Sequence, residues 1–199
     1  LGAASAADPV VFDRLPSAES WPDVSNGRDG RYVLVHVMVR WTQVDVHLLD
    51  TATGGWTVVI EGADAQTSLR IDGERLVGVT TLHAPNGRVI SAQLADPATW
   101  QTIVPERPDV VLGAHAVCGD ELLVVASSVG VDAVERWPGG TRLELGVASV
   151  GALDADDGRA FLARGSFSAP VESLRYTAAD GVQPWSMPPD PALLPALTV

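Results

Sequence analysis

The hydrophobic positions of this chain fall into short runs of Val, Leu, Ile and Thr, each closed by Gly, Asp, Asn or Pro. Tyr32–Met38, Val44–Leu49 and Arg75–Thr81 are examples. No window sustains the 3.6-residue repeat of an amphipathic helix, and short apolar runs between turn residues indicate strands. The pattern therefore predicts an all-β chain with less than about 10% helix.

Turn signals recur at a regular distance along the chain. Asp29-Gly30, Asp72-Gly73, Gly119-Asp120 and Asp157-Gly158 each precede an apolar strand, at a spacing of roughly 40–45 residues, which is the length of a four-stranded propeller blade. The repeat predicts a partial β-propeller of about four four-stranded antiparallel blades, at 17–61, 65–105, 108–146 and 147–187. A β-sandwich also has strands at short, even spacing, but the repeated turn and strand favour the propeller.

Two local predictions complete this picture. A strand is expected over Val10–Asp13, ahead of the first blade. The turn before the last strand of the second blade is expected at Pro97-Ala98, with Trp100 following it, because Pro and small residues commonly mark turns.

Charge and composition narrow the possible partners. The net charge is −12, from 13 basic and 25 acidic residues, and such a surface repels phosphate backbones, so no nucleic-acid partner is expected. No apolar run has membrane-spanning length, so no membrane partner is expected either. Residues 1–9 lack a basic start and an apolar core, which favours a cytoplasmic location. Cys118 stands alone in the sequence and is expected to be a buried cysteine at a strand end.

The sequence gives little indication of a metal site. The histidines show neither helical ligand spacing nor a neighbouring cysteine cluster; they are His36, His47, His83 and His115. The acidic run Asp154–Gly158 resembles a calcium loop at first, but the twelfth position from Asp154 is Gly165 instead of the required Glu. A hairpin turn explains the run better, so neither a metal site nor a cofactor is expected.

Several motifs resemble the prolyl oligopeptidase family of serine peptidases. The most specific is Thr80–Ile90, which contains Ala84-Pro85 and Arg88 and continues through Asp96-Pro97, Trp100 and Val104-Pro105-Glu106. Ser25–Val35 resembles a blade opening of that family, and Gly165–Pro170 resembles its Ser-Phe-x-x-Pro hinge in a late blade. The resemblance runs from about Asp8 to Val182.

The resemblance implies a seven-bladed propeller over an α/β-hydrolase domain, of which this chain would hold only the later blades. The family's catalytic serine lies on a Gly-x-Ser-x-Gly elbow in the hydrolase domain. The nearest string here, Ala126–Gly130, lacks the first glycine and stands between two expected strands. Ser128 is therefore not expected to be a nucleophile, and no catalytic residue is assigned. The chain alone is expected to have no peptidase activity, and the parent to cleave after proline.

The function implied is that of a non-catalytic propeller portion that gates the access of short peptides to the hydrolase site. Its partners would be its own hydrolase domain and short peptides, with Trp21, Pro22 and Leu49 placed near the substrate's distal subsites by the resemblance. The alternative is a stand-alone propeller acting as an interaction module, because propellers host many functions. Four blades of a seven-bladed pattern would leave open faces, which predicts self-association into a homo-oligomer.

Overall fold

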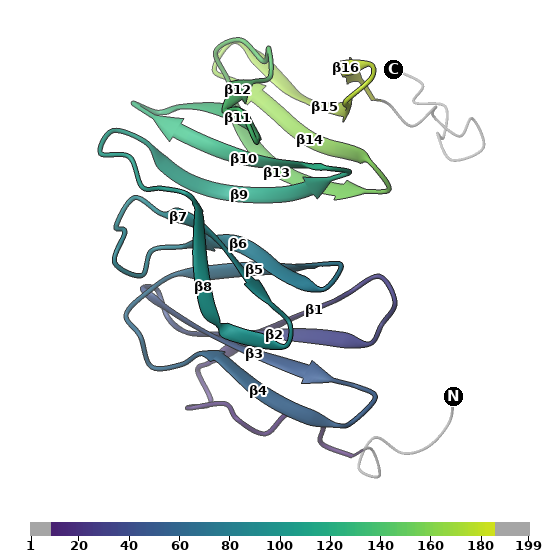
Figure 1. Cartoon of the computed structure of the whole chain (residues 1–199). Helices are drawn as coiled ribbons and strands as arrows, with labels where there is room; N and C mark the ends of the chain where they lie inside the picture. The colour runs from purple at the N-terminus through teal and green to yellow at the C-terminus, as the bar shows by residue number, and fades with distance from the viewer. Residues whose placement is uncertain (1–8, 186–199) are drawn as a thin grey trace, which may run out of the picture. The chain divides into compact units, whose positions relative to one another are not determined.

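The computed structural model describes residues 9–185, which form sixteen β-strands and no helix (Figure 1). The strands make four antiparallel sheets of four strands, each in simple sequential order. The prediction of an all-β partial propeller with four blades is confirmed. The chain divides into two compact units, one ending at Pro105 and one beginning at Glu106, and each contains two sheets. Within residues 9–185 there is no helix long and apolar enough to cross a membrane.

The first unit holds blades 1 and 2. Blade 1 consists of β1 (Trp21–Asn26), β2 (Tyr32–Arg40), β3 (Gln43–Asp50) and β4 (Gly55–Ile60). Blade 2 consists of β5 (Thr67–Asp72), β6 (Arg75–Thr80), β7 (Arg88–Gln93) and β8 (Asp96–Val104). Because each strand pairs only with its sequence neighbours, the first and last strands of a blade are its edges.

The second unit holds blades 3 and 4. Blade 3 consists of β9 (Val111–Cys118), β10 (Glu121–Ser128), β11 (Val131–Trp137) and β12 (Thr141–Arg142). Blade 4 consists of β13 (Ser149–Asp156), β14 (Arg159–Ser166), β15 (Ala169–Thr177) and β16 (Gly181–Pro184). All four sheets lie inside the predicted ranges, although residues 186 and 187 of the last range are outside the described residues.

The Asp-Gly dipeptides form the expected turns between first and second strands. Gly30, Gly73 and Gly158 all have positive φ, at 68°, 57° and 70°. At the β13–β14 turn Asp157 also has a positive φ of 49°. Two consecutive residues with positive φ make the turn whose twist matches the flanking strands, and Asp and Gly adopt that conformation at low cost.

The strand predicted over Val10–Asp13 is wrong. That segment contains no strand, and blade 1 begins instead with β1, Trp21–Asn26. The pattern missed β1 because Pro22 interrupts it. Proline lacks the N–H needed between two strands, but β1 pairs only with β2, and an edge strand accommodates proline.

The turn predicted at Pro97-Ala98 is also wrong, for the same reason. Both residues lie inside β8, and the hairpin turn is at Leu94-Ala95. β8 is the outer edge of blade 2, so Pro97 removes no hydrogen bond from the sheet interior. The Trp100 indole N–H donates to the carbonyl oxygen of Pro97 at 2.9 Å, which joins these two residues within the strand.

The core of each unit is the layer between its two sheets. In the first unit Leu34 and Val46 of blade 1 pack against Leu76 and Ile90 of blade 2, with at most 1% of each residue exposed. In the second unit the core joins Leu123 and Val134 of blade 3 to Leu162, Leu174 and Tyr176 of blade 4. Burying one such side chain stabilises the folded state by about 1.5–3 kcal/mol. Stacking two blades therefore provides the apolar burial that a single sheet lacks.

In each unit, one aspartate holds the chain where it crosses from the first blade to the second. The Asp45 carboxylate at the start of β3 accepts the N–H of Gly62 at 2.9 Å, in the link from blade 1 to blade 2. The Asp132 carboxylate at the start of β11 accepts the N–H of Val150 at 2.8 Å, on the first strand of blade 4. Neither aspartate stands out in the sequence; each lies near the start of the third strand of its blade.

The segment before β1 covers the face of blade 1 that points away from blade 2. The ring of Phe12 lies 5.2 Å from that of His47 and 5.1 Å from that of Trp56, between centroids. His47 is 1% exposed as a result, and burial lowers its pKa below the usual value. The chain preceding the blades therefore closes a face that would otherwise be open.

Candidate functional site

The structure separates the three residues predicted to lie near a substrate. Trp21 and Pro22 lie on β1, with Trp21 opposite Met38, whereas Leu49 on β3 lies opposite Val33. Met38 and Val33 are five residues apart along β2, which is about 17 Å at roughly 3.4 Å per residue. Leu49 also faces away from blade 2, as His47 does, so no single site contains all three residues.

Trp21 forms part of a pocket of ≈ 360 Å³ in the first unit. The walls come from the first three strands of blade 1 and from the first strand of blade 2 with the residue before it. They are Trp21, Asp23, Ser25, His36, Met38, Val44, Gln66, Thr67, Ser68, Leu69 and Arg70. The indole of Trp21 is largely exposed, at 75%, and stands beside the thioether of Met38 on the neighbouring strand. The lining therefore combines apolar side chains, such as Trp21 and Met38, with polar ones, such as Asp23 and Ser68.

His36 forms the inner wall of the Trp21 pocket. Its Nε2 accepts a hydrogen bond from the backbone N–H of Leu69 at 3.1 Å, which joins β2 of blade 1 to β5 of blade 2. Burial lowers the pKa of His36 below its usual value; the nearby carboxylate of Asp23 opposes this effect and the guanidinium of Arg70 adds to it. The ring is therefore neutral near pH 7, as its role as acceptor requires.

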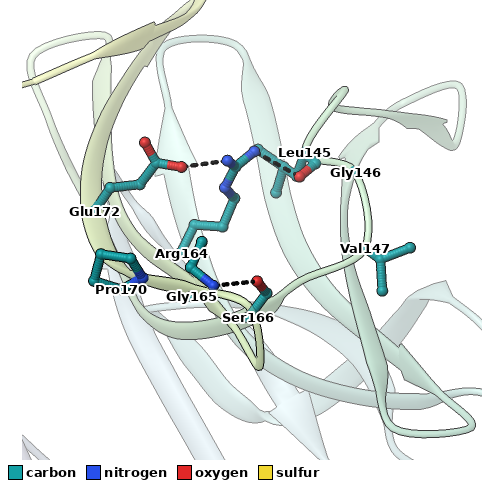
Figure 2. A pocket seen from close by; sticks show the side chains of 9 residues that line it. Leu145, Gly146, Val147, Arg164, Gly165, Ser166, Pro170 and Glu172 are labelled. Carbon is teal, nitrogen blue, oxygen red and sulfur yellow. Dashed lines mark hydrogen bonds and ion pairs between the residues drawn. The ribbon is translucent and has the colours of Figure 1, made fainter.

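A second pocket, of ≈ 180 Å³, lies in the second unit beside the β14–β15 hairpin (Figure 2). Arg164 extends across it, donating to the carbonyl oxygen of Leu145 at 2.7 Å and pairing with the carboxylate of Glu172. The remaining walls include Val147 and Pro170. The Arg164 guanidinium is already bonded to two partners within the chain, so we assign this pocket a structural role.

The Ser-Phe-x-x-Pro resemblance falls on that same hairpin. Ser166 ends β14, and its Oγ accepts the N–H groups of Ser168 at 3.3 Å and Ala169 at 3.1 Å. These bonds hold the turn while leaving Phe167 fully exposed to solvent. The sequence predicted a hinge here, and the structure shows a hairpin tip that presents an aromatic ring.

The two ends of the sheets differ in chemistry. We call the end that carries the connections between second and third strands the apolar end, and the end that carries the turns between first and second strands the Asp-Gly end. In the first unit the apolar end exposes Trp41 at 89%, and in the second unit it exposes Val129 and Phe167 completely. The β6–β7 connection is milder, since Leu82 there is only partly exposed. The opposite turns consist of Asp, Gly and charged residues.

Val129 is the least expected residue at the apolar end. It occupies the β10–β11 hairpin turn with a positive φ of 51°, next to Gly130 at 74°. A β-branched residue adopts that conformation only with strain. The Val129 side chain is wholly exposed. It therefore makes no apolar contact within the chain that would offset this strain.

The other residues considered from the sequence have local structural roles. Ser128 is the last residue of β10 and pairs with Val131, directly before the hairpin turn that leads into β11. Cys118 is buried at the end of β9, as predicted, and burial raises the pKa of its thiol. Asp154 and Asp156 lie on β13, and Asp157-Gly158 forms the predicted turn. Within residues 9–185 no three His, Cys, Asp or Glu side chains are grouped as metal ligands would be.

Comparison with solved structures finds the same fold within longer peptidase chains. One neighbour comes from a study of two prolyl endopeptidases and the role of inter-domain dynamics in their catalysis and specificity; it has a TM-score of 0.82 and 22% identity over 93% of this chain. Prolyl oligopeptidase B from Galerina marginata, bound to a 35mer substrate, has a TM-score of 0.78 and 17% identity over 92%. Oligopeptidase B from Trypanosoma brucei, with covalently bound antipain, has 0.76 and 15% over 92%.

The chain spans 29% of the length of each of these neighbours. A comparison with curated proteins finds no match. The family profile described as the prolyl oligopeptidase N-terminal beta-propeller domain matches residues 1–186, nearly the whole chain. The family profile, the blade topology and the motifs on the β6–β7 connection and on β8 agree, and the chain therefore belongs to the prolyl oligopeptidase family, as a part of its N-terminal propeller domain.

Proposed function

We propose that this chain is the non-catalytic propeller portion of a prolyl-oligopeptidase-like serine peptidase. In the whole protein it would restrict access to the hydrolase site, so that short peptides enter and folded proteins do not. The match to a propeller domain described as N-terminal supports this proposal, as does the limited share of the neighbours' length that the chain spans. The peptide bond would be cleaved, after proline, by residues of the hydrolase domain.

The observation that carries the proposal is the apolar end of the sheets. Water disfavours a fully exposed aromatic ring such as Phe167, and a strained, exposed valine such as Val129 gives no stability to the chain itself. Both features are explained if another surface covers them. We infer that this surface is the hydrolase domain of the same polypeptide, and that the polar Asp-Gly end faces solvent.

Trp21 is the residue proposed to meet the peptide. It stands at the start of β1, on the same side of blade 1 as the pocket, and its exposed indole offers a flat apolar surface for a peptide side chain. One neighbour is bound to a 35mer peptide substrate, which supports a peptide as the ligand class. Pro22 and Leu49 face away from this pocket, so the proposal for peptide contact rests on Trp21.

The test uses the polypeptide that carries this chain together with the hydrolase domain, and a length series of proline-containing peptides. The proposal expects cleavage of short peptides, little cleavage of a folded protein, and no turnover by the 199-residue chain alone. Trp21→Ala is expected to raise KM more for longer peptides, while kcat for a dipeptide ester stays within about twofold.

A stand-alone interaction module is the competing function. It would be favoured if the coding sequence around this stretch encodes no Gly-x-Ser-x-Gly elbow. Equal cleavage of short peptides and folded proteins by the full polypeptide would contradict the gating role while leaving the family assignment intact.

A further inference from the structure

The two blades of the first unit are joined by a hydrogen bond that a proton can break. His36 on β2 accepts the backbone N–H of Leu69 on β5 through Nε2, at 3.1 Å. Leu69 is 2% exposed, so its N–H cannot turn to water instead. A buried N–H that loses its acceptor is costly, which makes this one contact important for keeping β5 against β2.

Only one protonation state of His36 allows the contact. A neutral imidazole can present a lone pair at Nε2, whereas the imidazolium carries an N–H at that position. Protonation would therefore set two donors against each other across 3.1 Å. The change is a loss of attraction combined with a buried positive charge.

The groups around the ring set the pH at which this happens. Burial is the main reason that the pKa of His36 is lowered; Asp23, on β1, favours the charged form and Arg70, on β5, disfavours it. Asp23 and Arg70 both line the same pocket as His36. The single carboxylate does not outweigh burial and the guanidinium, so the ring stays neutral in the folded chain.

We propose that His36 is a proton-sensitive latch between blades 1 and 2, which holds β5 against β2 when neutral and releases it when protonated. Release would widen the pocket beneath Trp21, since β5 is one of its walls. The inference concerns regulation within the first unit and does not depend on the peptidase role.

The pH window follows from the direction of the pKa shift. The pKa of His36 is lower in the folded chain than the ordinary value of 6.5. Its contribution to holding the blades together is therefore complete above about pH 6.5, and it is lost as the pH falls toward the folded pKa. The latch is closed at neutral pH and opens on acidification.

Nuclear magnetic resonance of the 199-residue chain measures the latch directly. The imidazole signal of His36 and the amide signal of Leu69 would be followed from pH 8 to pH 5. The proposal expects both to titrate with one midpoint, below 6.5. Hydrogen exchange of residues 66–72, corrected for the intrinsic rate, should accelerate by up to about tenfold per pH unit within that window.

Two variants separate the latch from other histidines. His36→Gln keeps a side-chain acceptor that does not titrate, and should abolish the acceleration in residues 66–72. His83→Gln removes an exposed histidine from the β6–β7 connection and should leave it unchanged. His47 is also buried and also has a lowered pKa, and this is why a local signal at Leu69 is followed instead of global stability.

A Leu69 amide that does not follow the His36 titration would overturn the latch. Persistence of the full pH dependence in His36→Gln would overturn it as well. If His36→Gln does not fold, the two titrations in the unsubstituted chain still decide the question.

Discussion

Each unit joins its two blades through an aliphatic core, but the polar hydrogen bonds between the blades differ in chemistry. In the first unit one polar tie between the blades is the neutral His36, which accepts a backbone N–H. In the second unit a corresponding tie is charged: Glu121 on β10 accepts the hydroxyl of Tyr176 on β15 at 2.5 Å and the Nε–H of Arg136 at 3.1 Å. Both ties stand at the edge of an aliphatic core that joins two sheets.

The difference predicts that the two ties weaken in different pH ranges. The pKa of Glu121 is lowered, chiefly by the hydrogen bond from Arg136, so its tie persists through mild acid. Burial, followed by the hydrogen bond to Glu121, raises the pKa of Tyr176 to about 12, so the phenol stays protonated well into base. Blade stacking thus depends on apolar burial, and the polar tie determines which conditions loosen it.

The largest expected effect comes from the apolar core that each unit has between its own two blades. Leu34→Ala in the first unit and Leu123→Ala in the second should each lower the free energy of unfolding by about 3 kcal/mol, because both leucines are completely buried and a cavity remains. Denaturant unfolding measures the loss. Hydrogen exchange should show that each substitution accelerates exchange mainly in its own unit. Equal acceleration in both units would contradict the division of the chain into two.

A smaller effect is expected at a glycine that only the first unit requires. A Cβ on Gly78 of β6 would lie 2.0 Å from the carbonyl oxygen of Ser68 on β5, and backbone cannot move aside easily. Gly78→Ala should therefore cost about 2 kcal/mol. Gly113→Ala is the matched control in the second unit, since no atom lies within 4 Å of its added Cβ. An unchanged free energy of unfolding in Gly78→Ala would show that β5 and β6 are not packed this closely.

Removing the Tyr176 hydroxyl from the charged tie should lower the free energy of unfolding by a smaller amount. Tyr176→Phe deletes the hydroxyl that donates to Glu121 and should lower the free energy of unfolding at pH 7 by about 1.5 kcal/mol. The lowered pKa of Glu121 means that its contribution is complete above about 4.5 and lost as the pH falls below that value. The loss on acidification should be smaller in Tyr176→Phe than in the unsubstituted chain, as chemical denaturation at pH 7 and pH 3.5 would show. An identical loss would mean that Tyr176 does not interact with Glu121.

The smallest expected effect is weak self-association. Blade 1 has the Phe12 segment on its outer face, whereas the corresponding face of blade 4 carries Trp185, 40% exposed, in edge contact with Phe161 at 5.1 Å. We propose that this face of blade 4 pairs two copies of the chain. Light scattering should give an average mass above 20.8 kDa that rises with concentration, and Trp185→Glu should suppress the rise. Trp41→Glu, at the apolar end of the first unit, is the control and should leave it unchanged.

Local pattern predicted the architecture well because the turns carry specific chemistry. Asp157-Gly158 could be recognised because few residues adopt two successive positive φ angles. The errors at Pro22 and Pro97 have one cause: sequence identifies proline but not whether a strand is at an edge, where proline is tolerated. Edge position depends on which strands pair, and pairing is a property of the whole sheet.

The candidate site was less predictable. Trp21 was identified by resemblance, and it does line a pocket. Leu49 was grouped with it, yet it lies on the other face of the sheet, which depends on a strand register that the sequence does not display. The His36 bond to Leu69 was missed because it joins residues 33 positions apart in different blades. An isolated histidine in a strand gives no signal of such a partner.

We propose that the apolar end of the blades faces the hydrolase domain. Hydrogen exchange tests it most directly, by comparing the 199-residue chain with the longer polypeptide that includes that domain. If the hydrolase domain covers the apolar end, exchange is slower in the longer polypeptide for the connections around Trp41, Val129 and Phe167. No change is expected at the Asp-Gly turns, such as Asp72-Gly73 and Asp157-Gly158. Protection of the Asp-Gly turns with none at the apolar end would show that the apolar end does not face the hydrolase domain.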